Sequence, residues 1–316
     1  MKKIYVAIFL GLLVVCIIIL TTPQNGLLID GKYVKEAYYT LGEEATYVYE
    51  SIGEKKTVLK ATVTKLRLVD FLLYESDHYI EAYKPENKYF VVDIVVSNIG
   101  EKEEYMPTVK LRANGAIYTP TVEIPFTLSL SPMQTVKYSV LFDVPEDISS
   151  GRVEVIFDVY KEIRGYWTFT DFDKEFHKLK FKVGEGVTFG TEKTKYYLKI
   201  EDVLDLFVIG EGNGTNVLHL YRPESGYKFV AVKVYARNDG QSEVYVPYYS
   251  DFRLVSGGRE YTPVYFGLKD SYIGGTLEYG HYTSGYVYFE VPVDATNYKI
   301  MVFLVPSQTV RGEWTV

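Results

Sequence analysis

Cysteine and histidine are scarce in this sequence, which has one cysteine, Cys16, among its 316 residues. A single cysteine cannot form an intrachain disulfide. None of the histidines is spaced closely enough to another for the two to act as paired metal ligands, and a zinc site needs three or four converging nitrogen or sulfur ligands. We therefore expect no disulfide and no metal site. The four histidines are His78, His177, His219 and His281.

Positive charge is also limited, because the formal net charge is −7 and no lysine or arginine cluster stands out. Non-specific nucleic-acid binding depends on a basic surface, so we expect no nucleic-acid partner.

Motifs for catalysis or cofactor binding are missing as well. Gly210–Gly214 lacks the lysine and the following helix of a phosphate loop. Asp171, Asp173 and Glu175 alternate as in calcium loops, but the turn glycine and the distal glutamate are absent, which favours a solvated linker. We expect no catalytic residues, no cofactor and no enzymatic activity.

Long helix-forming stretches are absent after the first twenty residues, whereas the chain holds 31 tyrosines and 17 phenylalanines. Aromatic residues favour pleated, half-buried surfaces. The composition therefore predicts an all-β protein.

The N-terminus has the pattern of a membrane anchor. Lys2 and Lys3 precede an apolar run from Ile4 to Leu20, which is at the short end of what spans a bilayer and places the N-terminus in the cytoplasm. A cleaved signal peptide is the alternative, although no small-residue cleavage site follows Leu20. Val14-Val15 before Cys16 also lacks the small residue of a lipidation site. Both alternatives predict that the rest of the chain is extracytoplasmic.

An internal repeat organises the chain. Six segments recur in the same order: Lys84–Phe90 with Arg222–Phe229, Asn98–Gly100 with Asn238–Gly240, Tyr105–Pro107 with Tyr245–Pro247, Tyr118–Pro120 with Tyr261–Pro263, Phe142–Pro145 with Phe289–Pro292, and Arg164–Thr168 with Arg311–Thr315. We predict a tandem duplication. The expected segments are a membrane anchor or signal segment (1–22), a juxtamembrane spacer (23–42), copy 1 (43–169), a linker (170–179) and copy 2 (180–316).

Each copy shows the period-two alternation of strands with one buried face. Phe90, Val92, Ile94 and Val96 form such a face. Asn98-Ile99-Gly100 then predicts a tight hairpin that needs positive φ. Short strands with turn signals every 8–12 residues are typical of antiparallel, immunoglobulin-like β-sandwiches. Trp167 and Trp314 recur at one repeat position, which indicates a role in packing.

The order of these motifs resembles a family of exported immunoglobulin-like domains of unknown function, related to a secreted mycobacterial antigen. The shared motifs are a Gly-x-x-Lys strand, a Tyr-x-Phe-Val-x-Val strand, an Asn-x-Gly turn, a Tyr-x-Pro segment and a Phe-x-Val-Pro strand. The resemblance covers both copies and implies a sandwich fold behind a signal peptide or lipid anchor, with no catalytic residues. Members place Pro-Gly before the last strand, where this chain has Pro132-Met133 and Tyr279-Gly280.

Tyrosine clusters are the candidate ligand-binding residues, because aromatic platforms on β-sandwiches stack sugars or partner side chains. Packing of tyrosines at the edge of a core is the alternative. Asn213-Gly214-Thr215 is a glycosylation sequon on an expected hairpin tip. The candidate residues are Tyr245, Tyr248, Tyr249, Tyr279 and Tyr282, with Tyr286 and Tyr288 nearby.

These observations predict a non-enzymatic, membrane-anchored cell-surface module for adhesion, envelope architecture or protein contact, with an envelope protein or glycan as partner. A carbohydrate- or other ligand-binding module that uses the tyrosine clusters is the alternative.

Overall fold

The computed structural model describes residues 24–51, 53–76, 79–125, 127–212, 218–305 and 310–316. The apolar run Ile4–Leu20 and the sequon residue Asn213 lie outside these residues. Within the described ranges no helix is both long and apolar enough to cross a membrane. This part of the chain is all-β, as predicted, apart from the 3-10 helix η1 (Tyr249–Asp251).

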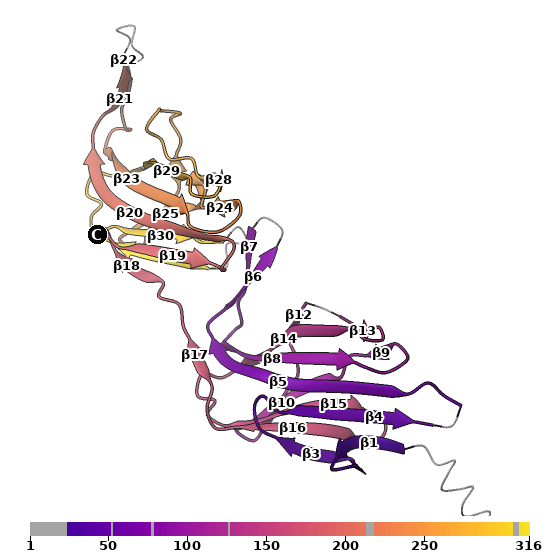
Figure 1. Ribbon diagram of the computed structural model, residues 1–316. Coiled ribbons are helices and arrows are strands. Elements are labelled where there is room, and N and C mark those ends of the chain that lie inside the picture. The colour runs from indigo at the N-terminus through magenta and orange to yellow at the C-terminus, as the bar shows by residue number, and fades with distance from the viewer. Residues whose placement is uncertain (1–23, 52, 77–78, 126, 213–217, 306–309) are drawn as a thin grey trace, which may run out of the picture. The chain divides into compact units, whose positions relative to one another are not determined.

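The chain divides into two compact units (Figure 1). Unit 1 contains the described residues up to Asp70 together with Pro85–Phe176, and unit 2 contains Phe71–Lys84 together with His177–Val316. Residues 71–84, which the repeat assigns to copy 1, thus belong to unit 2.

Unit 1 is built from two main sheets and a small ribbon. The first sheet has the order β12 (Val122–Ile124), β14 (Thr135–Val144), β8 (Lys88–Asn98), β5 (Thr57–Val69), β4 (Glu44–Glu50), β1 (Gln24–Ile29) and β2 (Lys32–Val34), with β17 (Asp173–Glu175) beside β5. The second sheet has the order β11 (Ala116–Tyr118), β10 (Thr108–Ala113), β15 (Gly151–Asp158), β16 (Ile163–Phe169) and β3 (Glu36–Tyr39). The ribbon pairs β9 (Glu104–Tyr105) with β13 (Ser129–Leu130).

Unit 2 repeats this strand order. Its first sheet is β27 (Pro263–Val264), β29 (Tyr282–Pro292), β23 (Tyr227–Asn238), β20 (Lys195–Leu206) and β19 (Gly186–Gly190). Its second sheet is β26 (Arg259–Tyr261), β25 (Phe252–Ser256), β30 (Lys299–Phe303), β31 (Arg311–Thr315) and β18 (Lys180–Lys182). Unit 2 also contains three two-stranded ribbons. They are β24 (Val244–Val246) with β28 (Gly275–Leu277), β21 (Ile209–Gly212) with β22 (Leu218–Tyr221), and β6 (Leu72–Ser76) with β7 (Tyr79–Tyr83).

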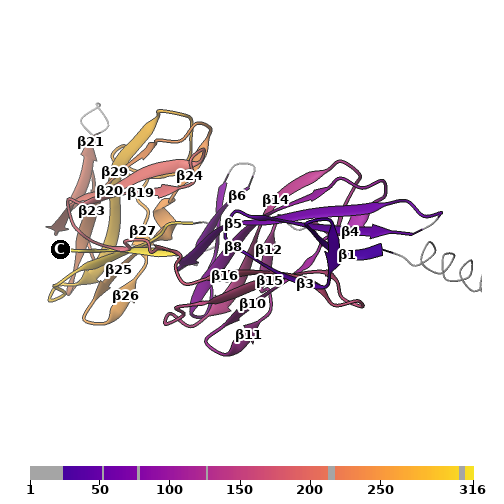
Figure 2. The ribbon, with the colours of Figure 1, turned by 60° about the horizontal axis from the view of Figure 1, so that its bottom comes forward.

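Each unit buries its own core between its two sheets (Figure 2). In unit 1 the predicted face of β8 is buried, and Val92 and Ile94 share one cluster with Val153 and Val155 of β15. In unit 2 the matching strands β23 and β30 likewise contribute buried apolar side chains to one shared cluster. Most strand pairs are antiparallel, but β3 with β16, β18 with β31 and β17 with β5 are parallel.

The predicted spacer 23–42 contains three strands of unit 1. Of its two turn signals, Asp30 (φ 47°) and Gly31 (φ 77°) form the hairpin turn that joins β1 to β2, whereas Asn25-Gly26 lies within β1. Leu27 and Ala37 are buried in the core of unit 1. The segment is therefore part of the fold, because its apolar side chains complete both sheets.

The Asn-x-Gly motif does not form the predicted tight hairpin. Asn98 is fully buried, and its amide nitrogen donates to the carbonyls of Lys102 (2.7 Å) and Leu130 (2.9 Å). Its side-chain oxygen accepts a hydrogen bond from the backbone N–H of Gly100 (2.9 Å). A Cβ at Gly100 would lie 2.7 Å from the carbonyl oxygen of Lys56, so the glycine allows a close backbone approach. Asn238 makes the matching three hydrogen bonds in unit 2.

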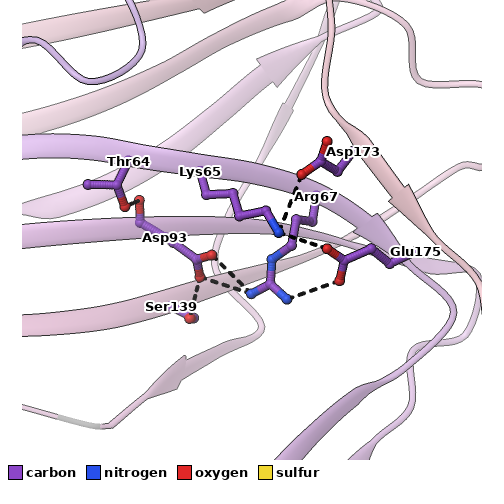
Figure 3. A network of polar contacts seen from close by, with 7 residues as sticks. All are labelled: Thr64, Lys65, Arg67, Asp93, Ser139, Asp173 and Glu175. Atoms are coloured by element: carbon purple, nitrogen blue, oxygen red, sulfur yellow. Dashed lines mark hydrogen bonds and ion pairs between the residues drawn. The ribbon is translucent and has the colours of Figure 1, made fainter.

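The predicted linker 170–179 contains the strand β17, which is held to unit 1. Figure 3 shows Glu175 of β17 facing Lys65 and Arg67 of β5, with Oε–N distances of 2.8 and 3.3 Å. Arg67 also bonds Asp93 (3.0 Å), whose carboxylate accepts a hydrogen bond from Ser139 (2.6 Å). Two of the acidic residues that alternate along this segment, Asp173 and Glu175, are therefore ion-pair partners of β5.

We expect these ion pairs to make the stability of unit 1 depend on acid pH. Burial alone would raise the pKa of Glu175, but the hydrogen bonds and charges of Lys65 and Arg67 outweigh burial and lower that pKa. The stabilisation is therefore present above the ordinary value of 4.5 and is lost as pH falls through the lowered pKa. Because the groups are half-exposed, its size is about 0.5–1 kcal/mol. Urea denaturation between about pH 5 and about pH 3 should show a steeper loss in the wild type than in Glu175→Gln. Equal slopes would contradict this role.

Candidate functional site

A groove of about 410 Å³ opens at one end of unit 1. Tyrosine contributes more of its wall than any other residue type. The lining residues are Tyr47, Tyr49, Thr57, Lys102, Glu104, Tyr105, Met106, Thr108, Ile156, Phe157, Asp158, Val159, Tyr160 and Lys161.

Three segments place the tyrosines in this groove. Tyr47 and Tyr49 are two residues apart on β4 and so point to the same side of the sheet. Tyr105 ends β9, and Tyr160 lies in the turn between β15 and β16. Tyr47 is 6% exposed and stacks on Phe157 with ring centroids 5.7 Å apart. Tyr105 and Tyr160 are 81% and 98% exposed, so the groove has a buried aromatic floor and an exposed aromatic rim.

Two lysines lie over the ring of Tyr49. Their Nζ atoms are 4.4 Å (Lys161) and 5.6 Å (Lys102) from the ring centroid, which is the range of cation–π interactions. The Tyr49 hydroxyl donates a hydrogen bond to Glu54 (3.0 Å). Tyr49 is therefore fixed from its face and from its hydroxyl, so this part of the wall is preformed.

The carboxylates of the groove are already bonded to neighbouring groups. Glu104 accepts a hydrogen bond from the buried Thr57 hydroxyl (2.6 Å) and pairs with Lys102 (3.1 Å). Asp158 accepts from the backbone N–H groups of Tyr160 and Lys161, both at 3.0 Å. Since two lysines balance two acids, the groove is polar without a net charge.

Burial of Tyr47 and the neighbouring charges of Asp158 and Glu104 raise the pKa of its phenol, which stays protonated. The lining residues include neither histidine nor cysteine. This arrangement suits the binding of a partly apolar, partly polar segment, with tyrosine rings for contact area and paired charges for hydrogen bonds.

The two units can be matched residue by residue through their tryptophans. The Nε1–H of Trp167 donates to the carbonyl of Glu43 (3.1 Å), and that of Trp314 donates to the carbonyl of Glu185 (3.0 Å). The buried asparagines Asn98 and Asn238 give a second reference point. Counting from these anchors, the groove residues of unit 1 and their matches in unit 2 are Tyr47 and Phe189, Tyr49 and Thr191, Thr57 and Thr194, and Tyr105 and Tyr245.

The matching end of unit 2 is covered by the hairpin β6–β7. Phe71, at the base of this hairpin, is 3% exposed and its ring centroid lies 6.1 Å from that of Phe189. Thr191 donates a hydrogen bond to Glu75 (3.0 Å). Figure 1 shows β7 next to β24, which carries Tyr245. One end of the same fold is thus a covered surface in unit 2 and an open groove in unit 1.

The predicted tyrosines of unit 2 fall into separate places. Tyr248 and Tyr249 adjoin each other at η1, with centroids 4.7 Å apart, and Tyr249 stacks on Tyr265 at 5.0 Å. Burial first, then the charge of Asp251 and the neighbouring Tyr248, raise the pKa of the half-buried Tyr245. The structure therefore brings Tyr245, Tyr248 and Tyr249 into one neighbourhood.

Tyr282 belongs to a different surface, the outer face of β29 and β23. Its ring stacks on Tyr235 at 5.7 Å, and Tyr235 also meets Tyr197 edge-on at 6.2 Å. Tyr279 lies in the turn before β29 and is 68% exposed. Tyr288 is buried and donates to Asp270 (3.2 Å), so it is a core residue.

The groove tyrosines of unit 1 were not among the residues singled out from the sequence. They come from two strands and a turn that are far apart in the chain, and only Tyr47 and Tyr49 are close in sequence. One signal was present, because Tyr105 is the repeat partner of the candidate Tyr245.

Groups of three or more histidine, cysteine or acidic residues suited to a metal ion do not occur in the described ranges.

Comparison with known proteins supports the motif-based resemblance. Residues 209–309, about a third of the chain, match the model of a domain of unknown function, DUF4352, and this confirms the predicted resemblance for that segment. No curated protein matches the chain.

Several solved structures match less than half of this chain each. The secreted protein MPT63 of Mycobacterium tuberculosis is 14% identical, with 44% of this chain and 98% of that chain covered and a TM-score of 0.33. The YjhA protein of Bacillus subtilis is 14% identical, with 43% and 98% covered and a TM-score of 0.31. An uncharacterised β-sandwich protein of Clostridium difficile is 17% identical, with 45% and 99% covered and a TM-score of 0.32.

Proposed function

Starting from the match to a family without an assigned function, we propose that this chain is an exported, non-enzymatic protein-binding module whose two units arose by duplication. Its apolar run Ile4–Leu20 anchors it in the membrane, and both units lie on the extracytoplasmic side. Its binding site is the tyrosine-lined groove of unit 1. In this proposal the chain acts by contact at the cell surface, in adhesion or envelope architecture.

The observation that carries the proposal is the difference between the matched ends of the two units. In unit 2 this end holds a β-hairpin through apolar contacts around Phe189 and a hydrogen bond at Thr191. In unit 1 the end offers polar aromatic residues, Tyr47 and Tyr49, and exposed rings at its rim. A surface that binds a polypeptide hairpin in one unit is well suited to bind a polypeptide segment in the other, and tyrosine is enriched at such interfaces.

Site-specific photo-crosslinking in cells tests this function. A benzoylphenylalanine at position 105 of the full chain should give protein adducts, because Tyr105 is at the open rim of the groove. The same group at position 245, the match in unit 2, should give at least about tenfold fewer, because that end is covered by the hairpin. Adding Tyr160→Asp, at a 98% exposed position, should reduce the adducts at 105 without affecting folding. Equal labelling at both positions, or no protein adduct, would count against a protein-binding groove.

Carbohydrate binding is the second candidate, and it rests on the stacked rings of Tyr248, Tyr249 and Tyr265 and of Tyr235 and Tyr282. Exposed stacked tyrosines present faces on which sugars can lie. Glycan-array binding by the full chain that is lost in Tyr248→Ala and Tyr282→Ala would favour this function, and binding unchanged in both would reject it.

A further inference from the structure

The two copies of the repeat each carry a hairpin at the same place in the chain. In unit 1 the strands β5 and β8 are joined through β6–β7, and in unit 2 the matching strands β20 and β23 are joined through β21–β22. Both hairpins begin directly after the long strand, and both close just before a Lys/Arg-Pro-Glu segment. The hairpins are therefore matched elements, although among the described residues only the first is docked on a sandwich end.

The apolar residues of the first hairpin are used in docking. Phe71 lies in the core of unit 2, and Leu73 and Ala82 pack against the same core. At the matched positions of the second hairpin, Val208 precedes β21 as Phe71 precedes β6, and Leu220 occupies the place of Ala82. Val208 and Leu220 are 44% and 50% exposed.

The base of the second hairpin is fixed to its own unit, so its orientation is set. Ile209 is buried in a small cluster with Phe229, and Tyr221 lies against Phe266 with centroids 4.7 Å apart. Phe207, next to Val208, is 62% exposed. Figure 1 shows β21 and β22 projecting beyond the end of β20. The chain thus holds a rigidly based hairpin with an exposed apolar surface.

We propose that the occupant of the unit 1 groove is the β21–β22 hairpin of a second copy of this chain. The contact would repeat between molecules the docking that β6–β7 makes within unit 2. Val208 and Leu220 would meet the groove wall of Tyr47 and Tyr49, beside Tyr105 of β9. This inference rests on the proposed protein-binding function and names its partner.

Such a contact joins two different surfaces, so it is heterologous and assembly is head-to-tail. An oligomer that does not close into a ring has a free groove at one end and a free hairpin at the other. The covalent connection of the β6–β7 hairpin gives it a high effective concentration at its docking surface, which favours docking. A contact between separate chains made by one hairpin is small, and we expect it to be weak in solution and strengthened when many chains share one membrane.

Cysteine crosslinking between full-length chains in detergent micelles tests the proposal. In a Cys16→Ser background, one tagged chain carries Leu220→Cys and a second, differently tagged chain carries Tyr105→Cys. A short bismaleimide should join these two chains at least about tenfold more than it joins Leu220→Cys with Tyr245→Cys, whose site is covered by β6–β7. Equal yields for the two mixtures, or no crosslink up to high concentration, would overturn the proposal.

A second measurement needs no cysteine in the hairpin and so tests the association independently of the crosslinking variants. Light scattering of the full chain should show a mean mass that rises with concentration, and Leu220→Asp should weaken this association by at least about tenfold because docking would bury a charge. Association that persists in Leu220→Asp would overturn the proposal.

The identity of the protein crosslinked at position 105 distinguishes a failure of this inference from a failure of the proposed function. Adducts that contain a peptide near residue 220 of the same protein support self-assembly. Adducts with another protein only would reject self-assembly and leave the binding function intact, whereas the absence of protein adducts would reject both.

Discussion

Trp314→Ala is expected to lower the free energy of unfolding of unit 2 by about 3–5 kcal/mol. The side chain is fully buried and its ring stacks on Phe181 with centroids 4.8 Å apart. Its Nε1–H donates to the carbonyl of Glu185, and Gly312 lies so close to the ring that a Cβ there would be 2.6 Å from it. Truncation therefore opens a cavity that the glycine cannot fill, and it leaves a backbone carbonyl without its donor.

Urea denaturation followed by circular dichroism, with amide hydrogen exchange to assign the loss to unit 2, measures this effect. Trp314→Phe is the control, since it keeps the ring stacking and should lose only about 1–2 kcal/mol. Trp167→Ala should cause a loss of the same size in unit 1, where the ring stacks on Tyr39 and bonds Glu43. A change below 1 kcal/mol in either alanine variant would show that the tryptophans do not hold their cores.

The sandwich cores were predictable because their signal is local. Val92 and Ile94 alternate along one strand, and such period-two patterns indicate a buried face without knowledge of the partner strand. The shared position of Trp167 and Trp314 likewise pointed to packing, and both are fully buried. Repetition within one chain supplied what an alignment of relatives would otherwise supply.

The prediction of a spacer at 23–42 was wrong because its turn residues are compatible with both a loop and a β-hairpin. Asp30-Gly31 is a turn signal both in a loop and in a two-residue hairpin. The strands around it, β1 and β2, are only six and three residues long. They enter the sheet because β1 pairs with β4 and β2 pairs with β1. In so short a segment, the sequence pattern does not indicate that it pairs with a strand elsewhere in the chain.

The groove and the position of the first hairpin were not predictable for a related reason. Phe71 follows β5 of unit 1 in the chain, yet its contacts are with His177 and Phe189 of unit 2. Local patterns indicate strand and turn, but they do not indicate which core an apolar residue enters. The matched positions Phe189 and Tyr47 did carry a signal. An apolar residue in one copy and a more polar one in the other is the pattern expected of a surface that is covered in one unit and open in the other.

Phe71→Ala is expected to undock β6–β7 from unit 2 and to reduce the stability of that contact by about 3 kcal/mol. The ring lies 4.1 Å from His177 and 6.1 Å from Phe189, centroid to centroid, and is 3% exposed. No other residue of the hairpin with a described side chain is buried to that extent. A loss of this size corresponds to a fall of about 100-fold in amide exchange protection for β7 and for the adjoining β24.

Val208→Ala is the matched control, because Val208 occupies the same position in the second hairpin but is 44% exposed. It should change stability by less than about 0.5 kcal/mol in the monomer, as substitutions at exposed positions do. If Phe71→Ala instead destabilised unit 1 and left exchange in β7 and β24 unchanged, the hairpin would belong to the unit from which it emerges. The same result would remove the precedent for hairpin docking on which the occupant of the open groove was inferred. A local loss confined to β6–β7 and its contacts would instead show that a sandwich end of this fold binds a hairpin through one aromatic anchor.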